Sequence, residues 1–206
     1  MSKEKILVAG ANGTTGRIIV DLLKNHNDYE PLAMIRKEEQ QSNFENVETV
    51  IGDLEKDLSH TVEHADKVIF AAGSGGKNVI GVDQDGAKSL TDVSEKANVK
   101  KFVMLSSMGA DNPSISDELE DYLKAKQNAD NYLKKSQLTY SIVRPGSLTN
   151  NEPKGKIKLK SSFGQFGKIT RSDVAQTLVE VLTDGVQDNN VFEILSGDTA
   201  ISEAVR

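Results

Sequence analysis

The chain has 206 residues, a formal net charge of -6 at pH 7 and 37% hydrophobic residues. This size and composition suit one folded domain over residues 1–206 and argue against a disordered chain. The acidic balance argues against binding of a long nucleic-acid backbone, and the absence of cysteine excludes disulfides, thiolate metal ligands and thiol catalysis.

Nothing in the sequence indicates export or membrane insertion. The first residues, MSKEK, lead into one short apolar run that has neither the hydrophobic region nor the cleavage site of a signal peptide. No apolar stretch reaches the length needed to cross a bilayer. We therefore expect a cytoplasmic protein with no membrane or nucleic-acid partner, and the sequence leaves both a monomer and a homodimer open.

Apolar runs of strand length alternate with segments of helical spacing along most of the chain. Because these runs are continuously apolar rather than alternating, we expect the strands to be buried on both faces. The sequence therefore predicts an α/β fold, a doubly wound and mostly parallel sheet with helices on both faces. The expected strands are 5–10 (KILVAG), 31–36 (PLAMIR), 47–52 (VETVIG), 67–73 (KVIFAAG), 101–107 (KFVMLSS), 139–145 (TYSIVRP) and 191–196 (VFEILS).

Two segments in the first two thirds of the chain carry clear helical signals. The first helix is expected to begin near Thr14 or Thr15 and to continue through residues 17–23. Residues 116–136 repeat apolar side chains every three or four positions, with acidic residues early and lysines late. That pattern predicts an amphipathic helix whose charges complement its dipole.

The carboxyl-terminal third is expected to add one more helix and a small substrate-side region. The helix should span about 171–184, with Ser172 or Asp173 as its N-cap and Gly185 at its end. Residues 149–167 are rich in lysine, glycine and asparagine and predict only a short hairpin in KIKLK. We expect this region, about 147–170, to lie over the carboxyl edge of the sheet, with its lysines solvated.

The glycines Gly10, Gly13 and Gly16 follow the first expected strand and precede the first helix. In a dinucleotide-binding loop the first glycine permits a tight turn, the second lets the backbone approach a pyrophosphate, and the third lets the helix pack closely. The start of the helix would direct free N–H groups and its positive dipole end at the phosphates. The alternative is a plain glycine-rich turn between a strand and a helix. The predicted phosphate site comprises Gly10, Asn12, Gly13, Thr14, Thr15 and Gly16.

The residues at the end of the second expected strand bear on the choice of dinucleotide. Arg36 stands 20 positions after Gly16 and is followed by Lys37. A carboxylate here would bind the ribose 2′-hydroxyl of NAD, whereas a cation accepts the 2′-phosphate of NADP. The sequence therefore predicts NADP(H) as cofactor, and the alternative is a solvated pair of surface cations.

Taken together, the motifs of the chain resemble the atypical branch of the short-chain dehydrogenase/reductase superfamily, which includes NmrA-like and biliverdin reductase B-like proteins. The resemblance runs almost from end to end and implies a Rossmann-like fold. It also implies that Asp53 and Leu54 face the adenine, that Ala71, Ala72 and Gly73 pass beside the adenosine ribose, and that Pro145 borders the nicotinamide. The motifs that carry it are GANGTTG, GDL at 52–54, AAG at 71–73, VDQDG at 82–86, KFVMLSS at 101–107, YLKAK at 122–126, RPG at 144–146 and TRSDVA at 170–175.

Tyr122 and Lys126 stand four positions apart on an expected helix and so share one face. A neighbouring ammonium favours the phenolate and eases proton exchange with a substrate carbonyl or alcohol. The alternative is ordinary packing, since Tyr132 and Lys135 show that such neighbours are common in this helix.

The resemblance implies catalytic roles for four residues. Tyr122 would be the proton donor, Lys126 its electrostatic partner and a ligand of the nicotinamide ribose, and Ser107 the ligand of the substrate oxygen. Asp83 stands where an assisting asparagine is usual, and Met108 stands where many extended members carry serine or threonine.

These features predict an NADP(H)-dependent oxidoreductase that transfers hydride to a small carbonyl, quinone or flavin-like acceptor, and they predict no metal site. Two alternatives stay open. One is a non-catalytic NADP-binding sensor similar to NmrA-like proteins, and the other is an epimerase or dehydratase acting on a nucleotide sugar.

Overall fold

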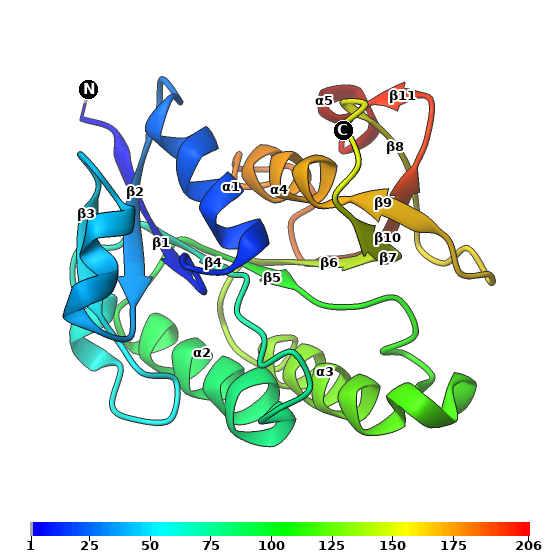
Figure 1. The fold of residues 1–206 in the computed structure, drawn as a ribbon, viewed down its shortest axis with the longest axis horizontal. Helices are drawn as coiled ribbons and strands as arrows, with labels where there is room; N and C mark the ends of the chain where they lie inside the picture. Colours follow the sequence, from blue (N-terminus) through cyan, green and yellow to red (C-terminus); the bar gives the residue numbers. More distant parts are fainter. Residues whose placement is uncertain (1) are drawn as a thin grey trace.

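The computed structural model describes residues 2–206 and is built on one nine-stranded sheet (Figure 1). The strand order is β11-β8-β10-β6-β5-β4-β1-β2-β3, and the seven strands from β10 to β3 are all parallel. The predicted α/β class is therefore confirmed. These strands are β1 (Glu4–Ala9), β2 (Tyr29–Ile35), β3 (Glu48–Ile51), β4 (Lys67–Phe70), β5 (Lys101–Leu105), β6 (Tyr140–Pro145) and β10 (Asn190–Ser196).

Helices cover both faces of the sheet. Figure 1 shows α1 (Thr14–Lys24) and α4 (Arg171–Glu180) on one face and α2 (Ala87–Lys96) and α3 (Glu120–Leu133) on the other. A short α5 (Ile201–Ala204) ends the chain. Each face has its own buried core, which is why the central strands are apolar on both sides.

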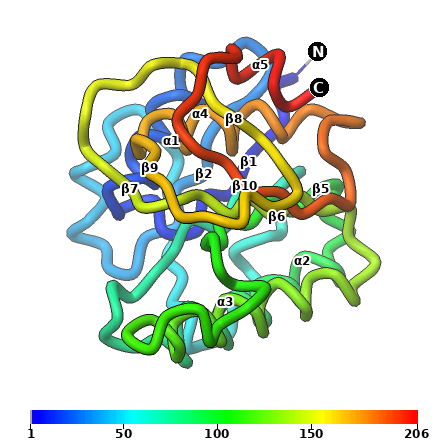
Figure 2. The backbone as a smooth tube through the Cα atoms, turned by 90° about the vertical axis from the view of Figure 1, so that its right-hand side faces the viewer, coloured from blue at the N-terminus to red at the C-terminus, as the bar shows by residue number. Residues whose placement is uncertain are grey.

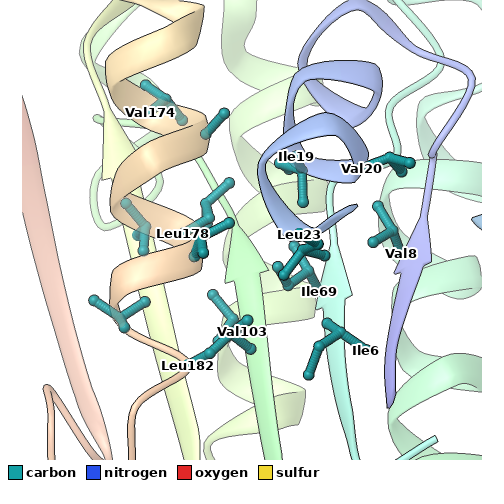
Figure 3. Close-up of a cluster of buried hydrophobic side chains, with 14 of the residues drawn as sticks. Ile6, Val8, Ile19, Val20, Leu23, Ile69, Val103, Val174, Leu178 and Leu182 are labelled. Atoms are coloured by element: carbon teal, nitrogen blue, oxygen red, sulfur yellow. The ribbon is translucent and has the colours of Figure 1, made fainter. Parts of the chain in front are cut away.

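The core under α1 and α4 shows how the two helices are held to the sheet. Figure 3 shows Ile19 and Leu23 of α1 and Leu178 of α4 directed toward Ile69 and Val103 of the central strands. All five side chains are fully buried. Burying a side chain of this size stabilises the fold by about 1.5–3 kcal/mol, so this packing fixes where α1 begins relative to the sheet.

Two predicted helices are shorter than expected. The segment 116–136 begins with a 3-10 turn at Asp117–Leu119 and becomes α-helical only over α3. The predicted helix 171–184 ends as α4 at Glu180, and Gly185 lies in the turn beyond it.

The N-cap predicted for α4 was also wrong. Thr170 is the cap, and its hydroxyl accepts a hydrogen bond from the backbone N–H of Asp173 at 3.0 Å. The buried carboxylate of Asp173 instead accepts a hydrogen bond from the backbone N–H of Gly155 at 2.8 Å.

The expected hairpin in KIKLK is instead a single strand of the main sheet. β8 (Lys156–Lys160) pairs antiparallel with β10 on one side and with β11 (Thr199–Ala200) on the other. Its alternating pattern buries Ile157 and leaves the three lysines exposed. The strands β7 (Ser147–Thr149) and β9 (Lys168–Thr170) form a separate two-stranded sheet.

A charged network lies at the amino ends of the strands, opposite the edge where the glycine turn lies. The buried ammonium of Lys67 contacts Glu4 at 2.9 Å and Asp184 at 2.7 Å. Lys100 contacts Glu4 at 2.8 Å and Asp66 at 2.9 Å. Burial opposes these charges, but the hydrogen bonds to the two lysines hold the pKa of Glu4 below its usual value.

Within residues 2–206, no helix is both long and apolar enough to cross a membrane.

Candidate cofactor and acceptor site

The glycine turn between β1 and α1 is tightly packed. A Cβ atom on Gly16 would lie 2.1 Å from the carbonyl oxygen of Gly10, and one on Gly10 would lie 2.6 Å from the backbone of Ala72. Gly10 also has a φ of +86°, a backbone angle that residues other than glycine rarely adopt. The fold therefore requires glycine at both positions.

Gly13 differs from the other two glycines because it faces solvent. A Cβ atom there would meet only the Gly10 oxygen, at 3.2 Å, and the φ of Gly13 is -75°. Packing alone gives little reason for glycine at this position. A ligand that approaches the backbone closely would provide one.

The first turn of α1 can hold an anion. Gly13 is its N-cap, no side chain caps the helix, and the first turn carries no acidic residue. The first N–H groups of a helix have no partners inside the helix, and they lie at the positive end of its dipole. The residues fit a dinucleotide pyrophosphate, which would meet the N–H groups near Thr14 and Thr15. The turn lies between β1 and β4, where the strand order reverses and open α/β sheets bind ligands.

Cations lie beside this turn, at the carboxyl end of β2. Arg36 is exposed and makes no ion pair among residues 2–206, while Lys37 lies 3.7 Å from Glu39. Arg17 was not predicted as a site residue. Its guanidinium donates to the side-chain oxygen of Asn12 at 2.7 Å, which fixes it at the edge of the glycine turn. An arginine directly after the third glycine was the signal that could have identified it.

The residues that the resemblance assigns to the adenosine follow the carboxyl ends of β3 and β4. The N–H of Ala71 donates to Ala9 at 2.9 Å, so Ala71 and Ala72 extend from β4 alongside the glycine turn. Leu54 is buried against Gly86, and the half-buried Asp53 lies 3.6 Å from Lys56. Gly73 is exposed at the same edge.

Lys126 is the central cation of the site. Its side chain is 5% exposed, and its ammonium lies 3.4 Å from both Asp83 Oδ1 and the carbonyl oxygen of Leu105. It also lies 5.7 Å from the ring centroid of Tyr122. The structure thus brings together three of the four predicted catalytic residues, with Lys126 between Tyr122 and Asp83.

Asp83 lies on a π-helical segment, Val79–Gly86, that leads into α2. Its other oxygen accepts from the N–H and hydroxyl of Ser74 at 3.0 and 2.7 Å. Asp83 therefore links the loop after β4 to Lys126. The hydroxyl of the half-buried Tyr122 makes no hydrogen bond within residues 2–206 and so remains available to a ligand.

Two adjacent serines follow β5 and have different environments. Ser106 is buried and donates to Asp130 Oδ2 at 2.9 Å. Ser107, the predicted ligand of the substrate oxygen, is half-buried and donates to the carbonyl oxygen of Met108 at 3.2 Å. Met108 itself is buried, so of these three side chains that of Ser107 is the most accessible.

Asp130 and Arg144 form a buried ion pair behind these serines. The guanidinium donates to Asp130 Oδ2 at 3.0 Å from Nε and lies 2.9 Å from it at Nη2. Burial raises the pKa of the Asp130 carboxyl, and the charge of Arg144 opposes that shift. Arg144 directly precedes Pro145, so the pair ties α3, the end of β5 and the end of β6 into one unit.

Pro145 and Gly146 end β6 at the same edge. Pro145 accepts a hydrogen bond from Met108 N–H at 3.0 Å, and Gly146 packs against Gly167. Within residues 2–206, no group of acidic and histidine side chains is arranged to hold a metal ion.

Comparison with known proteins also indicates dinucleotide binding. A family model described as NAD(P)H-binding matches residues 10–185. The chain belongs to this NAD(P)H-binding family. Its mostly parallel sheet is the Rossmann-like fold that the sequence predicts.

Similar proteins carry two kinds of name. The chain is 35% identical to the uncharacterised sugar epimerase YhfK of Bacillus subtilis (strain 168), over 98% of this chain and 99% of that protein. A Bacillus halodurans structure, provisionally described as an NAD-dependent epimerase/dehydratase, is 39% identical with a TM-score of 0.93 and covers 97% of each chain. The structure of the oxidoreductase ylbE of Lactococcus lactis is 34% identical with a TM-score of 0.90, over 98% of this chain and 94% of that one.

Proposed function

We propose that the protein is an NADP(H)-dependent oxidoreductase that transfers hydride to a small carbonyl, quinone or flavin-like acceptor. The main support is the buried Lys126 ammonium, which lies beside Tyr122 at the carboxyl ends of β4 and β5, next to the glycine turn. A buried ammonium and an accessible phenol at a dinucleotide site suit proton transfer to a substrate oxygen.

The bound NADPH would supply the hydride. Lys126 has two protein partners at the long distance of 3.4 Å, which leaves donor capacity for the hydroxyls of the nicotinamide ribose. Tyr122 would give a proton to the reduced acceptor, and Ser107 would orient the acceptor oxygen. Asp83 would hold Lys126 in place while it holds the loop beside the adenosine.

The cations at the edge of the glycine turn support NADP(H) over NAD(H). Arg36 and Lys37 follow β2, and Arg17 is held at the glycine turn by Asn12, whose side-chain oxygen also accepts from Asn43 at 3.2 Å. A 2′-phosphate would gain charge-assisted hydrogen bonds from these groups.

The direct test is NADPH oxidation with a panel of carbonyl, quinone and flavin acceptors, using Tyr122→Phe and a matched control. Tyr132→Phe is that control, because Tyr132 lies on the same helix and its hydroxyl donates to Asp92 at 2.8 Å, away from Lys126. We expect Tyr122→Phe to lower kcat for carbonyls about 100-fold and Tyr132→Phe to leave it unchanged. Full activity of Tyr122→Phe with every acceptor would refute the proton-donor role, and no turnover with any acceptor would refute the oxidoreductase.

One observation favours a second candidate, a sensor that binds NADP without chemistry. Asp83 already neutralises Lys126, which reduces the help that the ammonium gives to a Tyr122 phenolate. A sensor would bind NADP(H) tightly and oxidise no NADPH across the whole panel.

The names of two relatives raise epimerase chemistry as a third candidate. The segment after Pro145 contributes β8, β10 and β11 to the sheet that holds the cofactor edge, which leaves little chain for a nucleotide-sugar domain. An epimerase would retain a tightly bound dinucleotide through purification and interconvert sugar nucleotides with no net oxidation of cofactor.

A further inference from the structure

Asp130 is a buried charge that the proposed proton transfer does not use. It lies on α3 one helical turn beyond Lys126 and two turns beyond Tyr122, and its side chain is fully buried. Its Oδ1 atom has no hydrogen-bond partner within residues 2–206, so every hydrogen bond to this carboxylate is made at Oδ2. A buried ion pair adds little to stability compared with apolar residues of the same volume. The fold alone therefore gives a weak reason for a charge at this position.

Ser106 connects Asp130 to the end of β5. Its hydroxyl donates to Asp130 Oδ2 at 2.9 Å, and its backbone N–H donates to the carbonyl oxygen of Val143 on β6 at 2.8 Å. Ser106 is therefore fixed at both its side chain and its backbone. The next residue is Ser107, the proposed ligand of the acceptor oxygen, so these two contacts set the point from which Ser107 extends.

Arg144 connects Asp130 to the end of β6 and to the chain after β5. Its Nε donates to Asp130 Oδ2 at 3.0 Å, and its Nη1 lies 3.6 Å from Asp111 Oδ1. The next residue is Pro145, whose carbonyl oxygen accepts from the N–H of Met108 at 3.0 Å. The guanidinium therefore holds the residue proposed to border the nicotinamide together with the chain that follows Ser107.

One carboxylate oxygen thus joins the two residues that directly precede Ser107 and Pro145. Figure 2 shows α3 beneath the sheet, with the green chain after β5 leading from the sheet toward this helix. Hydride transfer needs the reacting atoms of acceptor and nicotinamide about 3–3.5 Å apart, and a displacement of about 1 Å can lower the rate about 100-fold. The separation of Ser107 and Pro145 must therefore stay fixed for the reaction to proceed.

We propose that Asp130 is a positioning residue for hydride transfer, which holds Ser107 through Ser106 and Pro145 through Arg144. This inference rests on the proposed hydride transfer. The negative charge matters because charge-assisted hydrogen bonds are about twice as strong as neutral ones, and a guanidinium matches the geometry of a carboxylate. In Asp130→Asn the amide oxygen can take the place of Oδ2, and the amide NH₂ group can take the place of the unpartnered Oδ1. This variant keeps the shape of the contacts and removes the charge.

The first test measures NADPH oxidation by Ser106→Ala, which breaks the connection to Ser107 and leaves the pair of Asp130 and Arg144 intact. The control is Ser94→Ala, because Ser94 on α2 is also fully buried and its hydroxyl has no partner within residues 2–206. At a temperature well below Tm, Ser106→Ala should lower kcat about tenfold and change KM for NADPH less than twofold. Ser94→Ala should leave both constants unchanged. An unchanged kcat in Ser106→Ala would overturn the proposal.

The second test compares Asp130→Asn with Asp188→Asn. Asp188 pairs with the buried ammonium of Lys101 at the amino ends of the strands, so both variants weaken a buried ion pair but only one lies beside the site. Both should lower Tm, whereas only Asp130→Asn should lower kcat, by about tenfold or more. Equal kcat values in the two variants would show that Asp130 serves stability alone.

The third test does not depend on turnover, because it follows the fluorescence of NADPH bound to each variant. The phosphates bind at the glycine turn, so Asp130→Asn should change the Kd of NADPH less than twofold. It should nevertheless shift the emission of bound NADPH toward that of free NADPH, since Pro145 no longer keeps its place beside the nicotinamide. If this shift occurs and no acceptor is reduced, hydride transfer fails and the positioning of the nicotinamide stands. If Asp130→Asn oxidises NADPH as fast as the wild type, or its emission does not shift, the positioning role fails and the reductase stands.

Discussion

Replacing Gly13 and Gly16 separately by alanine distinguishes cofactor binding from folding in the glycine turn. At Gly16 the new methyl would lie 2.1 to 2.9 Å from three backbone atoms of Gly10 and Ala11, and backbone cannot rotate away as a side chain can. Overpacking of this kind costs about 3 kcal/mol. For a chain of this length that lowers Tm by about 6–12 °C.

At Gly13 the same methyl would meet only the Gly10 oxygen at 3.2 Å, and the backbone there suits any residue. The strain of this contact is partly offset because alanine lowers the conformational entropy of the unfolded Gly13→Ala variant. Its Tm should therefore change by less than about 3 °C. The methyl would however stand where a pyrophosphate must approach the backbone, which should weaken NADPH binding at least about tenfold.

The assay is a thermal scan of each variant with and without NADPH, together with calorimetric titration. At a concentration of about 100 Kd, NADPH should stabilise the wild type by about 2.7 kcal/mol, and a tenfold weaker variant should lose about half of that gain. If Gly13→Ala binds NADPH as the wild type does, the pyrophosphate does not lie against the backbone of this turn.

Three further predictions concern charges. In calorimetric titration, Arg36→Ala should weaken NADPH binding about tenfold and leave NADH binding unchanged. An equal loss of affinity for NADPH and NADH would refute the 2′-phosphate contact. Asp130→Asn should lower stability by about 3 kcal/mol in denaturant titration because it removes the buried partner of Arg144 and leaves only Asp111, at 3.6 Å. Adding Arg144→Met should recover part of the loss, and an unrecovered double variant would contradict the pairing. The pKa of Glu4 is lower in the folded protein than in the unfolded chain, so ionised Glu4 stabilises the fold above its unfolded pKa, and this stabilisation disappears as pH falls below about 4. Lys100→Met should therefore flatten the fall of Tm between pH 5 and pH 3. An unchanged slope would count against the network.

The sequence predicted the parallel half of the fold well because its signals are local. Runs such as KILVAG and KVIFAAG are apolar on both faces, which only a covered parallel sheet explains. In KIKLK, apolar and charged residues alternate as in a half-buried strand. Its partner β10, however, lies more than 30 positions further along the chain, and sequence spacing does not reveal pairing over that distance. The chain just beyond α4 is also held by a distant residue, because the buried Lys67 ammonium donates to the carbonyl oxygen of Leu182 at 2.9 Å.

For the site, spacing predicted which residues meet but not how they are oriented. Tyr122 and Lys126 lie one helical turn apart, so their proximity follows from the helix alone. Of two neighbouring serines, Ser106 turns inward because Asp130 and Arg144 are buried behind it, and both of these come from other elements. Arg17 was missed because its position depends on the side chain of Asn12.

Both the reductase and the sensor require the turn from Gly10 to Gly16 to hold the pyrophosphate, and a crystal structure with NADP⁺ tests this most directly. We predict phosphate oxygens about 2.7–3.2 Å from the backbone nitrogens of Thr14 and Thr15, with the nicotinamide beside Pro145. NADP⁺ found with its phosphates elsewhere on the protein would contradict it, as would an empty turn in crystals grown with saturating NADP⁺.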